Sequence, residues 1–587
     1  MSSIFCCLKR KPARAHADGS STDNNPDEVG ADQFISDTFQ RLVADPNDQD
    51  QQQKLSTQFS THPAAVFTTL REQAAQLLPS LGPQPTTVSS LANPPLPDTS
   101  PDWTNSIGTQ RCTPLRKTKP QSLADLVSTI TAARASNHRV RAVGSGHAFS
   151  DVARTDGAVL INPVLLNDVR PVDAGALREG VDATTLVRVQ AGITVRSLKV
   201  ELENRGLALV NMGGYDGQTI SGTLSTGTHG SGIGFGPLAS FARAVVLVAE
   251  SGVVYWVEPE RGITEPGRWA GSVDGVAAVL KQDDEWFRAV QVAMGCLGVV
   301  YEYVLEVTEA FAVRELRSST TWKEVREELK PELWAPVPPV VSAVDHFELV
   351  LNPYNRWFRN ACVKVERTRL PGNTPSSGQR QDWLSALLEQ VAIQKAPDLV
   401  AFLTNVPFIS PLVIDQAIMT LVYKEPYIDK SYNVFSLGAA NEIKGMALEL
   451  HCDAKQCVPT IDKLLDVFQE QALRYMWYMA GPLGIRFVAP SDAFLAPEAG
   501  RMTCTIELAM LVGLKTGEDL ARHVKERMCT KDGSSVRVHW GLDLDFATGE
   551  DLRAWYPDFG RWYEVYKGLN STGMFNNKFT DRMGISL

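Results

Sequence analysis

Two glycine-rich blocks constrain the fold of this 587-residue chain more than any other feature. The first, RAVGSGHAFS, spans residues 141–150, and the second, GGYDGQTISGTLSTGTHGSGIGFG, spans residues 213–236. Because glycine has no Cβ, the backbone N–H groups of such loops can approach a ligand closely and form a cradle for an anion. The second block lies between apolar segments and contains the sequence TLST, and both features favour an ordered backbone over a flexible linker. Both blocks are therefore predicted to bind a ligand, with His147 inside the first.

Helix and strand patterns alternate around these blocks. Ser122 and Asp125 form the capping-box pattern, and apolar residues at helical spacing follow them. Residues 194–209 are predicted to form a helix that Gly206 ends. Strands are predicted at 138–143, 157–162, 187–192 and 242–259.

The pattern changes twice along the chain. Residues 1–110 are rich in Gln, Asp, Pro, Ser and Thr, contain one amphipathic helical stretch over about 32–78, and end in a Pro-rich linker. Beyond about residue 311, long strands and amphipathic helices replace the glycine blocks. We expect a partly disordered N-terminal extension over 1–110, a ligand-binding α+β domain over 111–311, a second domain over 312–525 and a C-terminal segment over 526–587.

Charge and cysteine content exclude several classes of function. The net charge is −10, and Lys and Arg are scattered, so nucleic acid is not an expected partner. The nine cysteines form neither a dense disulfide framework nor a CxxC pair suited to zinc, which predicts a reducing intracellular compartment and no metal site. No run of about 18 uncharged apolar residues occurs, so no membrane-spanning helix is expected.

The N-terminus carries a separate signal. Cys6 and Cys7 stand beside Lys9 and Arg10 in MSSIFCCLKRKPARAH. Acylated cysteines next to basic residues would bind anionic lipid, which predicts peripheral membrane association. The alternative is an unmodified disordered basic tail.

In their order and separation, the two glycine blocks resemble the FAD domain of the vanillyl-alcohol oxidase superfamily. The resemblance is to its aldonolactone (gulonolactone and arabinonolactone) oxidases and alditol oxidases. RAVGSGHAFS resembles their GSGHS loop, SGTLSTGTHGSG their second flavin loop, and GCLGVV at 295–300 a further flavin-contacting strand. RFVAPSDAFLAPEAGR, VHWGLDLDF and the last 30 or so residues resemble substrate-domain and C-terminal motifs, so the resemblance covers about 118–587.

This resemblance implies a two-domain α+β flavoprotein, with a PCMH-type FAD-binding domain and a substrate (cap) domain on a large antiparallel sheet. In the family, the histidine at the position of His147 is bonded to the 8α-methyl of the flavin, so the implied cofactor is FAD held covalently by His147. His229 is expected to order the second loop through hydrogen bonds. The flavin-contacting residues so implied are Gly144, Ser145, Gly146, His147, Ala148, Ser150, Gly213, Gly214, Ser221, Gly222, Thr226, Gly227, Thr228, His229, Gly230, Gly298 and Val300.

The substrate site departs from the family pattern. Alditol oxidases orient and deprotonate the polyol with a Ser, an E-x-R pair, a Thr and a Lys. The matching positions here hold Gly214, Gly484 with Arg486, Ala509 and Leu542, so only the arginine remains. Arg486 can stabilise an oxyanion but cannot act as a base near pH 7, so the base must come from another residue.

Three residues are the main candidates for that base. Glu507 lies two residues from Ala509 and hence on the same strand face, but it could instead be a buried partner of Arg486. His451 could instead face solvent. The catalytic candidates are Arg486, Glu507, Glu449 and His451, with Asp543 and His539 as weaker ones.

The sequence therefore predicts an FAD-dependent oxidase that takes a hydride from a CH–OH group of a lactone or alcohol and passes the electrons to O2 as hydrogen peroxide. Gly213 aligns with a family position that controls oxygen access, and its lack of a side chain favours O2 as acceptor. Three alternatives stay open: a dehydrogenase with a quinone or cytochrome acceptor, an oxidase of a bulky apolar alcohol such as a sterol, and a flavin-binding protein without turnover.

Overall fold

The computed structural model describes residues 102–330, 337–354, 360–378, 406–422, 425–436, 445–529 and 536–587, together with isolated positions between 34 and 69 and at 400, 403 and 404. The chain forms two compact units, Met1–Pro79 and Ser80–Leu587, and the elements below belong to the second. Isolated positions of the helix expected over 32–78 are helical. Cys6, Cys7 and the Pro-rich linker lie outside the described residues.

The first large sheet contains the strands that flank the glycine blocks. Its order is β11-β12-β10-β9-β13-β7-β6, with β8 also paired to β13. β10 and β12 are parallel, and the other pairs are antiparallel. Its strands are β6 Val169–Pro171, β7 Leu186–Gln190, β8 Leu207–Leu209, β9 Ala242–Val248, β10 Val254–Glu258, β11 Ser272–Val273, β12 Val276–Gln282 and β13 Val299–Glu309.

A small parallel sheet, ordered β3-β5-β4, carries the first glycine block. Its strands are β3 Arg116–Thr118, β4 Val140–Ala142 and β5 Val159–Ile161. Helix α4, Leu123–Ala135, precedes β4 and buries Leu126 and Ile130 completely in a core shared with both sheets. Burying each such side chain contributes about 1.5–3 kcal/mol.

The start of α4 forms only part of the predicted capping box. The Ser122 hydroxyl accepts the N–H of Asp125 at 3.1 Å, as the pattern predicts. The Asp125 carboxylate, however, accepts the N–H of Gln121 at 3.1 Å, one residue before the cap. In a capping box this carboxylate would accept the N–H of the capping residue itself.

The second large sheet is antiparallel throughout its described pairs, as expected for the substrate domain, and its order is β17-β14-β16-β15-β19-β20-β18-β21. Only Ala310 separates β13 from β14, so the chain passes directly from one large sheet into the other. The strands are β14 Phe311–Thr321, β15 His346–Leu351, β16 Ala361–Pro371, β17 Tyr427–Lys430, β18 Gly445–Asp453, β19 Leu483–Val488, β20 Thr503–Leu511 and β21 Arg537–Val538.

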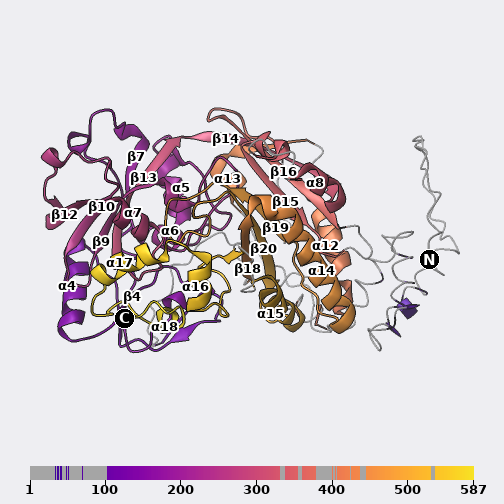
Figure 1. Cartoon of the computed structure of the whole chain (residues 1–587). Coiled ribbons are helices and arrows are strands. Elements are labelled where there is room, and N and C mark those ends of the chain that lie inside the picture. Colours follow the sequence, from indigo (N-terminus) through magenta and orange to yellow (C-terminus); the bar gives the residue numbers. More distant parts are fainter. Residues whose placement is uncertain are drawn as a thin grey trace, which may run out of the picture. The chain divides into compact units, whose positions relative to one another are not determined.

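Helices cover one face of this second sheet (Figure 1). Alternation along β19 turns Leu483, Ile485 and Phe487 to one face, where all three are fully buried. Gly484 and the Arg486 side chain lie on the opposite face, so β19 contributes its charged residue to that face. The covering helices are α8 Trp322–Glu328, α12 Ser410–Met419, α14 Cys457–Tyr475 and α15 Lys515–Met528.

The C-terminal segment contains α16, α17 and α18, which Figure 1 draws in yellow, with α17 beside the first sheet. These helices are α16 Gly549–Trp555, α17 Phe559–Leu569 and α18 Lys578–Arg582. α17 packs on α7, Asp284–Gln291, and its Trp562 donates to the carbonyl of Ala289 at 3.2 Å. The described helices include none that is both long and apolar enough to cross a membrane. The seven described cysteines are all buried and form no disulfide.

Candidate functional site

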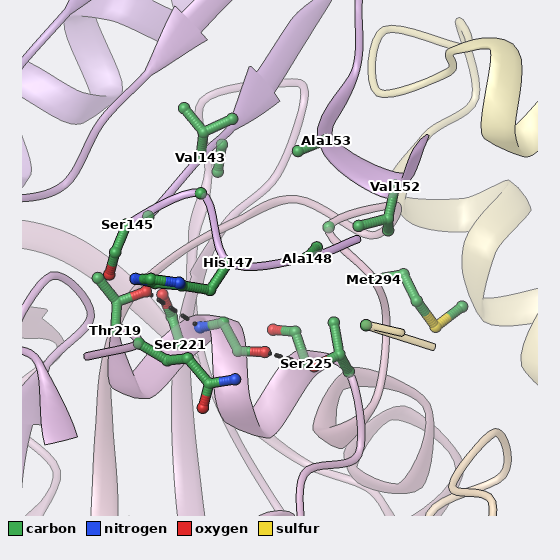
Figure 2. Close-up of a pocket in the computed structure, with 18 of the residues that line it drawn as sticks. Val143, Ser145, His147, Ala148, Val152, Ala153, Thr219, Ser221, Ser225 and Met294 are labelled. Carbon is green, nitrogen blue, oxygen red and sulfur yellow. Dashed lines mark hydrogen bonds between the residues drawn. The ribbon is translucent and has the colours of Figure 1, made fainter. Parts of the chain in front are cut away.

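A cavity lies where four segments of the chain meet (Figure 2). The first glycine block forms one wall, and the segment 218–226, which includes helix α6 Ile220–Ser225, forms another. Residues 294–300 and the 539–542 segment form the other walls, and Val152, Ala153 and Pro163 complete the lining. The sequence motifs at these four places lie far apart along the chain, and folding brings them around one space.

Small residues let the walls of this cavity approach each other. A Cβ at Gly144 would lie 2.1 Å from the hydroxyl oxygen of Thr219, so any side chain there would force the two loops apart. Gly146 adopts φ +73°, a backbone conformation that glycine accepts without strain. The five N–H groups of residues 144–148 donate to no acceptor within the described part of the chain. They are therefore available for the anion cradle that the sequence predicts.

The C-terminal segment fixes the far end of this loop. The N–H of Phe149 donates to the carbonyl of Gly541 at 2.8 Å, and the Ser150 hydroxyl donates to the carbonyl of Trp540 at the same distance. The Ser150 side chain, predicted to contact the flavin, is thus engaged by the HWG motif and does not line the cavity.

Arg141, in β4, adds a buried positive charge to the cavity lining. Its guanidinium donates to backbone carbonyls, including those of Gly295 at 3.3 Å and Phe575 at 3.1 Å, and to the Cys296 sulfur at 3.9 Å. Among the described residues, no carboxylate lies within ion-pair distance of it. A buried cation without a counter-ion favours binding of an anionic ligand nearby.

His147 enters the cavity as a neutral imidazole. Its Nε2 lies 3.0 Å from the Tyr215 hydroxyl, and the two ring centroids are 4.6 Å apart. Burial, helped by the positive charge of Arg196, lowers the pKa of His147 to about 4. Near pH 7 the ring therefore keeps a lone pair on one nitrogen, as a nucleophile requires.

The predicted flavin contacts divide into two groups. Ten of them line the cavity: Gly144, Ser145, Gly146, His147, Ala148, Ser221, Gly222, Thr226, Gly298 and Val300. Gly213 is instead packed inside the second block, where an added Cβ would lie 3.1 Å from the Thr228 methyl group. Outside the cavity lining are Ser150, Gly213, Gly214, Gly227, Thr228, His229 and Gly230.

The catalytic candidates lie on the face of the second sheet opposite its covering helices. Glu348 in β15 is opposite Arg486 in β19, and Glu507 in β20 is opposite both Gly484 and Glu449. Directly opposite residues share a face, so these side chains form one charged group. The Arg486 guanidinium contacts Glu348 at 3.0 Å and Glu507 at 2.9 Å, and lies 3.9 Å from Glu449.

The charges in this group stabilise one another. Burial alone would raise the pKa of Glu348, but Arg486 and Arg367 overcome it and lower the pKa to about 2. Burial disfavours the charge of Arg486, yet the surrounding carboxylates more than offset this and raise its pKa. Glu507 is thus a partner of Arg486, but its side chain is 28% exposed and is not the buried partner that one sequence alternative proposed.

Glu449 and His451 occupy a deeper position. Glu449 Oε1 lies 3.1 Å from His229 Nε2, and Oε2 lies 3.4 Å from His451 Nε2. Despite burial, contact with His229 and His451 lowers the pKa of Glu449 well below its usual range, which makes it a poor proton acceptor. The idea that His451 faces solvent is wrong, because this residue is fully buried.

His229 orders the second glycine block, as expected. Its Nδ1 donates to the carbonyl of Gly230 at 2.8 Å, while Nε2 faces Glu449. Burial would lower the pKa of His229, but the Glu449 carboxylate reverses this and raises it to about 9.

The two weaker candidates have different surroundings. His539 lines the cavity and accepts the N–H of Gly541 at Nδ1. Burial lowers its pKa to about 4. The Asp543 carboxylate is held by Lys525 at 3.0 Å.

Sequence reasoning missed several residues of the site. Tyr215 could have been found as the aromatic residue inside the second glycine block, and Arg141 as the charged residue that begins the first. Glu348 and Glu498 carry no local signal, because they join the site only through strand pairing and a loop.

Comparison with known proteins agrees with this geometry. The FAD binding domain family matches residues 114–258, and the D-arabinono-1,4-lactone oxidase family matches residues 304–583. The chain fits the aldonolactone oxidase branch of the vanillyl-alcohol oxidase superfamily. It has an FAD-binding domain and is an FAD-dependent oxidoreductase.

Named relatives span most of the chain. The L-gulono-1,4-lactone dehydrogenase of Mycobacterium tuberculosis is 28% identical, covering 82% of this chain and 99% of its own. The L-gulonolactone oxidase of Bos taurus is 25% identical, covering 82% and 97%, and the alditol oxidase of a Streptomyces species is 24% identical, covering 74% and 88%. The crystal structure of cholesterol oxidase from B. sterolicum shares the fold with a TM-score of 0.61 at 14% identity, covering 84% of this chain and 100% of that one.

Proposed function

We propose that this protein oxidises a CH–OH group of an aldonolactone, using FAD bound covalently to His147, and that O2 accepts the electrons and leaves as hydrogen peroxide. The observation that carries the proposal is the cavity lined by a buried Arg141, a neutral His147 and residues 144–148, whose five backbone N–H groups have no acceptor in the described part of the chain. FAD, when bound, supplies the hydride acceptor and the two-electron reduction of O2.

The residues present fit this cofactor. The cradle at 144–148 and the buried charge of Arg141 suit a pyrophosphate, which carries negative charge and oxygen acceptors. Gly144 and Gly146 leave the space that side chains would fill. When Nε2–H of His147 donates to the Tyr215 oxygen, Nδ1 keeps the lone pair, and we propose Nδ1 as the atom that bonds the flavin.

Arg486 and Glu507 are the proposed substrate residues. Arg486 presents a planar fork of donors that stabilises the developing alkoxide, and Glu507 takes the hydroxyl proton. Exposure favours Glu507 over Glu449 as this base, because the Glu449 side chain is only 4% exposed and is held by histidines.

Strand register supports this assignment of Glu507. The family's E-x-R pair has lost its carboxylate at Gly484, but Glu507 lies directly opposite Gly484. A Cβ at Gly484 would lie 3.7 Å from a carboxylate oxygen of Glu507. The neighbouring strand thus supplies a carboxylate to Arg486 at the place where the family supplies it from the same strand.

Family and relatives favour a lactone substrate, since their names refer to arabinonolactone and gulonolactone. A dehydrogenase with another electron acceptor is the second candidate, because a 28% identical relative is named a dehydrogenase. Gly213 packs inside the second block and does not line the cavity, so it gives no independent support for O2 as acceptor.

The test uses the full-length flavin-loaded protein under anaerobic conditions. We expect D-arabinono-1,4-lactone or L-gulono-1,4-lactone to bleach the flavin absorbance, and dissolved O2 to restore it with one hydrogen peroxide per flavin. Restoration by a quinone or cytochrome c alone would select the dehydrogenase. Bleaching by cholesterol but by neither lactone would overturn the substrate class, and no bleaching by any of these alcohols would contradict the proposed activity.

A further inference from the structure

Four buried side chains from three segments of the chain meet beside the cavity without belonging to its lining. His229 comes from the second glycine block, Glu449 and His451 from β18, and Glu498 from the loop before β20. Each side chain is at most 4% exposed. The group adjoins the cavity at His539, whose ring centroid lies 6.2 Å from that of His229 and 6.1 Å from that of His451.

The distances within this group suit ligands of one cation. One ligand atom each from His229, Glu449 and His451 lies within 4.8 Å of the others. The two imidazole Nε2 atoms lie 3.1 and 3.4 Å from separate oxygens of the Glu449 carboxylate. Donors that each lie about 2.1 Å from one ion are about 3.0 Å apart in octahedral geometry and about 3.4 Å apart in tetrahedral geometry.

Hydrogen bonding accounts for only part of the cluster, namely the contact between His229 Nε2 and Glu449 Oε1. Both ring nitrogens of the fully buried His451 make no hydrogen bond in the described part of the chain, although carboxylates lie nearby. The same holds for both carboxylate oxygens of the fully buried Glu498. Four such atoms without hydrogen bonds are costly, since each one costs about 1–3 kcal/mol.

The outer contacts match those of metal-binding histidines. His229 donates Nδ1–H to the Gly230 carbonyl, which directs Nε2 toward Glu449. His451 Nδ1 lies 3.3 Å from Glu498 Oε1, which leaves its Nε2 toward Glu449. A carbonyl or carboxylate at the second ring nitrogen is the usual partner of a histidine that binds a metal.

We propose that this cluster binds one divalent transition-metal ion, of the zinc, manganese and iron(II) class. Nε2 of His229, Nε2 of His451 and the Glu449 carboxylate are the ligands, and Glu498 orients His451. The ion joins the second glycine block to the second sheet and so fixes the junction beside the cavity. This site differs from the sequence expectation of no metal, which rested on the absence of a CxxC pair.

Cobalt(II) and zinc are the probes. The full-length flavin-loaded protein is dialysed against a chelator, then against buffer, and titrated with Co²⁺ while the d–d absorption beyond the flavin bands is recorded. We expect saturation at one ion per chain, displacement by one equivalent of Zn²⁺, and one zinc per chain by elemental analysis after gel filtration.

Three variants make the test specific. Glu498→Gln keeps the shape of the side chain and should raise the dissociation constant about 10- to 100-fold, as loss of an outer partner does. His451→Phe should abolish the site. His523→Gln is the matched control, because it removes a histidine 3.4 Å from a carboxylate on α15, away from the cluster, and should bind as the wild type does.

Substoichiometric cobalt, or equal binding by wild type and Glu498→Gln, would overturn the proposal even if His451→Phe fails to fold. The outcome is independent of the proposed function. A protein that reduces its flavin with a lactone but binds no ion refutes only the metal site, and the reverse result refutes only the activity.

Discussion

The cavity and the charged face of the second sheet are built from different kinds of chemical group. Backbone N–H groups and side chains as small as Gly144 and Gly146 shape the cavity, and they come from short continuous motifs. The charged face is built from long side chains such as Arg486 and Glu507, which strand pairing collects from distant segments. The proposed cofactor site is thus determined by local sequence, while the proposed substrate site depends on the register of paired strands. Substitutions at the two sites should affect different steps.

The largest effect is expected on the charged face. Glu507→Gln should slow anaerobic flavin reduction by a lactone about 10²- to 10⁴-fold, because the hydroxyl proton loses its acceptor. Flavin content should not change. Glu449→Gln provides the comparison: if it slows reduction as strongly while Glu507→Gln does not, the base has been assigned to the wrong strand.

The opposing position of Gly484 allows a rescue experiment. Glu507→Ala should lose activity, and adding Gly484→Glu should restore about 10- to 150-fold by returning one charge-assisted bond to Arg486. A Cβ at Gly484 would lie 3.7 Å from its nearest neighbours, which are atoms of the Glu507 side chain. The first carbon of a glutamate side chain therefore fits at this position without a clash. No recovery, in a double variant whose flavin content is normal, would mean that the two positions are not equivalent.

Arg486→Ala should slow flavin reduction about 30- to 1000-fold, as expected for loss of a charge-assisted donor at a developing oxyanion. Arg486→Lys should not rescue it, because an ammonium lacks the planar fork that contacts Glu348 and Glu507 together. Stopped-flow reduction compares the three proteins. Rates within about threefold of wild type would make this arginine a scaffold residue only.

A smaller effect is expected in the cavity. Tyr215→Phe removes the hydroxyl that lies 3.0 Å from His147 Nε2. Loss of one such hydrogen bond, about 0.5–1.5 kcal/mol, should slow covalent flavin attachment in the apoprotein about 2- to 10-fold. Affinity for FAD before attachment should stay unchanged. An unchanged attachment rate would show that the hydroxyl does not orient the ring.

The smallest expected change is in the pH dependence of attachment. The pKa of His147 in the folded protein is about 4, below its ordinary value of 6.5, so the neutral ring persists as pH falls. The attachment rate should therefore be constant from pH 8 to pH 5 and halve near pH 4. Halving near pH 6.5 would indicate an imidazole in contact with water. As the pH falls, His147 is protonated near pH 6.5 in the unfolded chain but only near pH 4 in the folded protein. The free energy of unfolding therefore decreases between pH 6.5 and pH 4.

The sequence predicts the cavity better than the charged face for a physical reason. A motif such as GSGH specifies turn geometry and nucleophile within a few residues, so its role can be inferred locally. Glu348 joins Arg486 only because β15 pairs with β19, and Glu498 meets His451 only when a loop folds back on β18. Periodicity assigns strands but not their neighbours, which is why these partners and the burial of His451 were not predicted.

The most direct test of the account is whether His147 holds the flavin. Wild-type protein and His147→Ala are denatured in acid, separated on a gel, and examined for flavin fluorescence, and the peptide containing His147 is analysed by mass spectrometry. The account predicts that flavin stays with the wild-type band and adds the mass of FAD to that peptide, while His147→Ala binds some FAD when folded and releases all of it on denaturation. Flavin that co-migrates with denatured His147→Ala, or that leaves the denatured wild type, would contradict it.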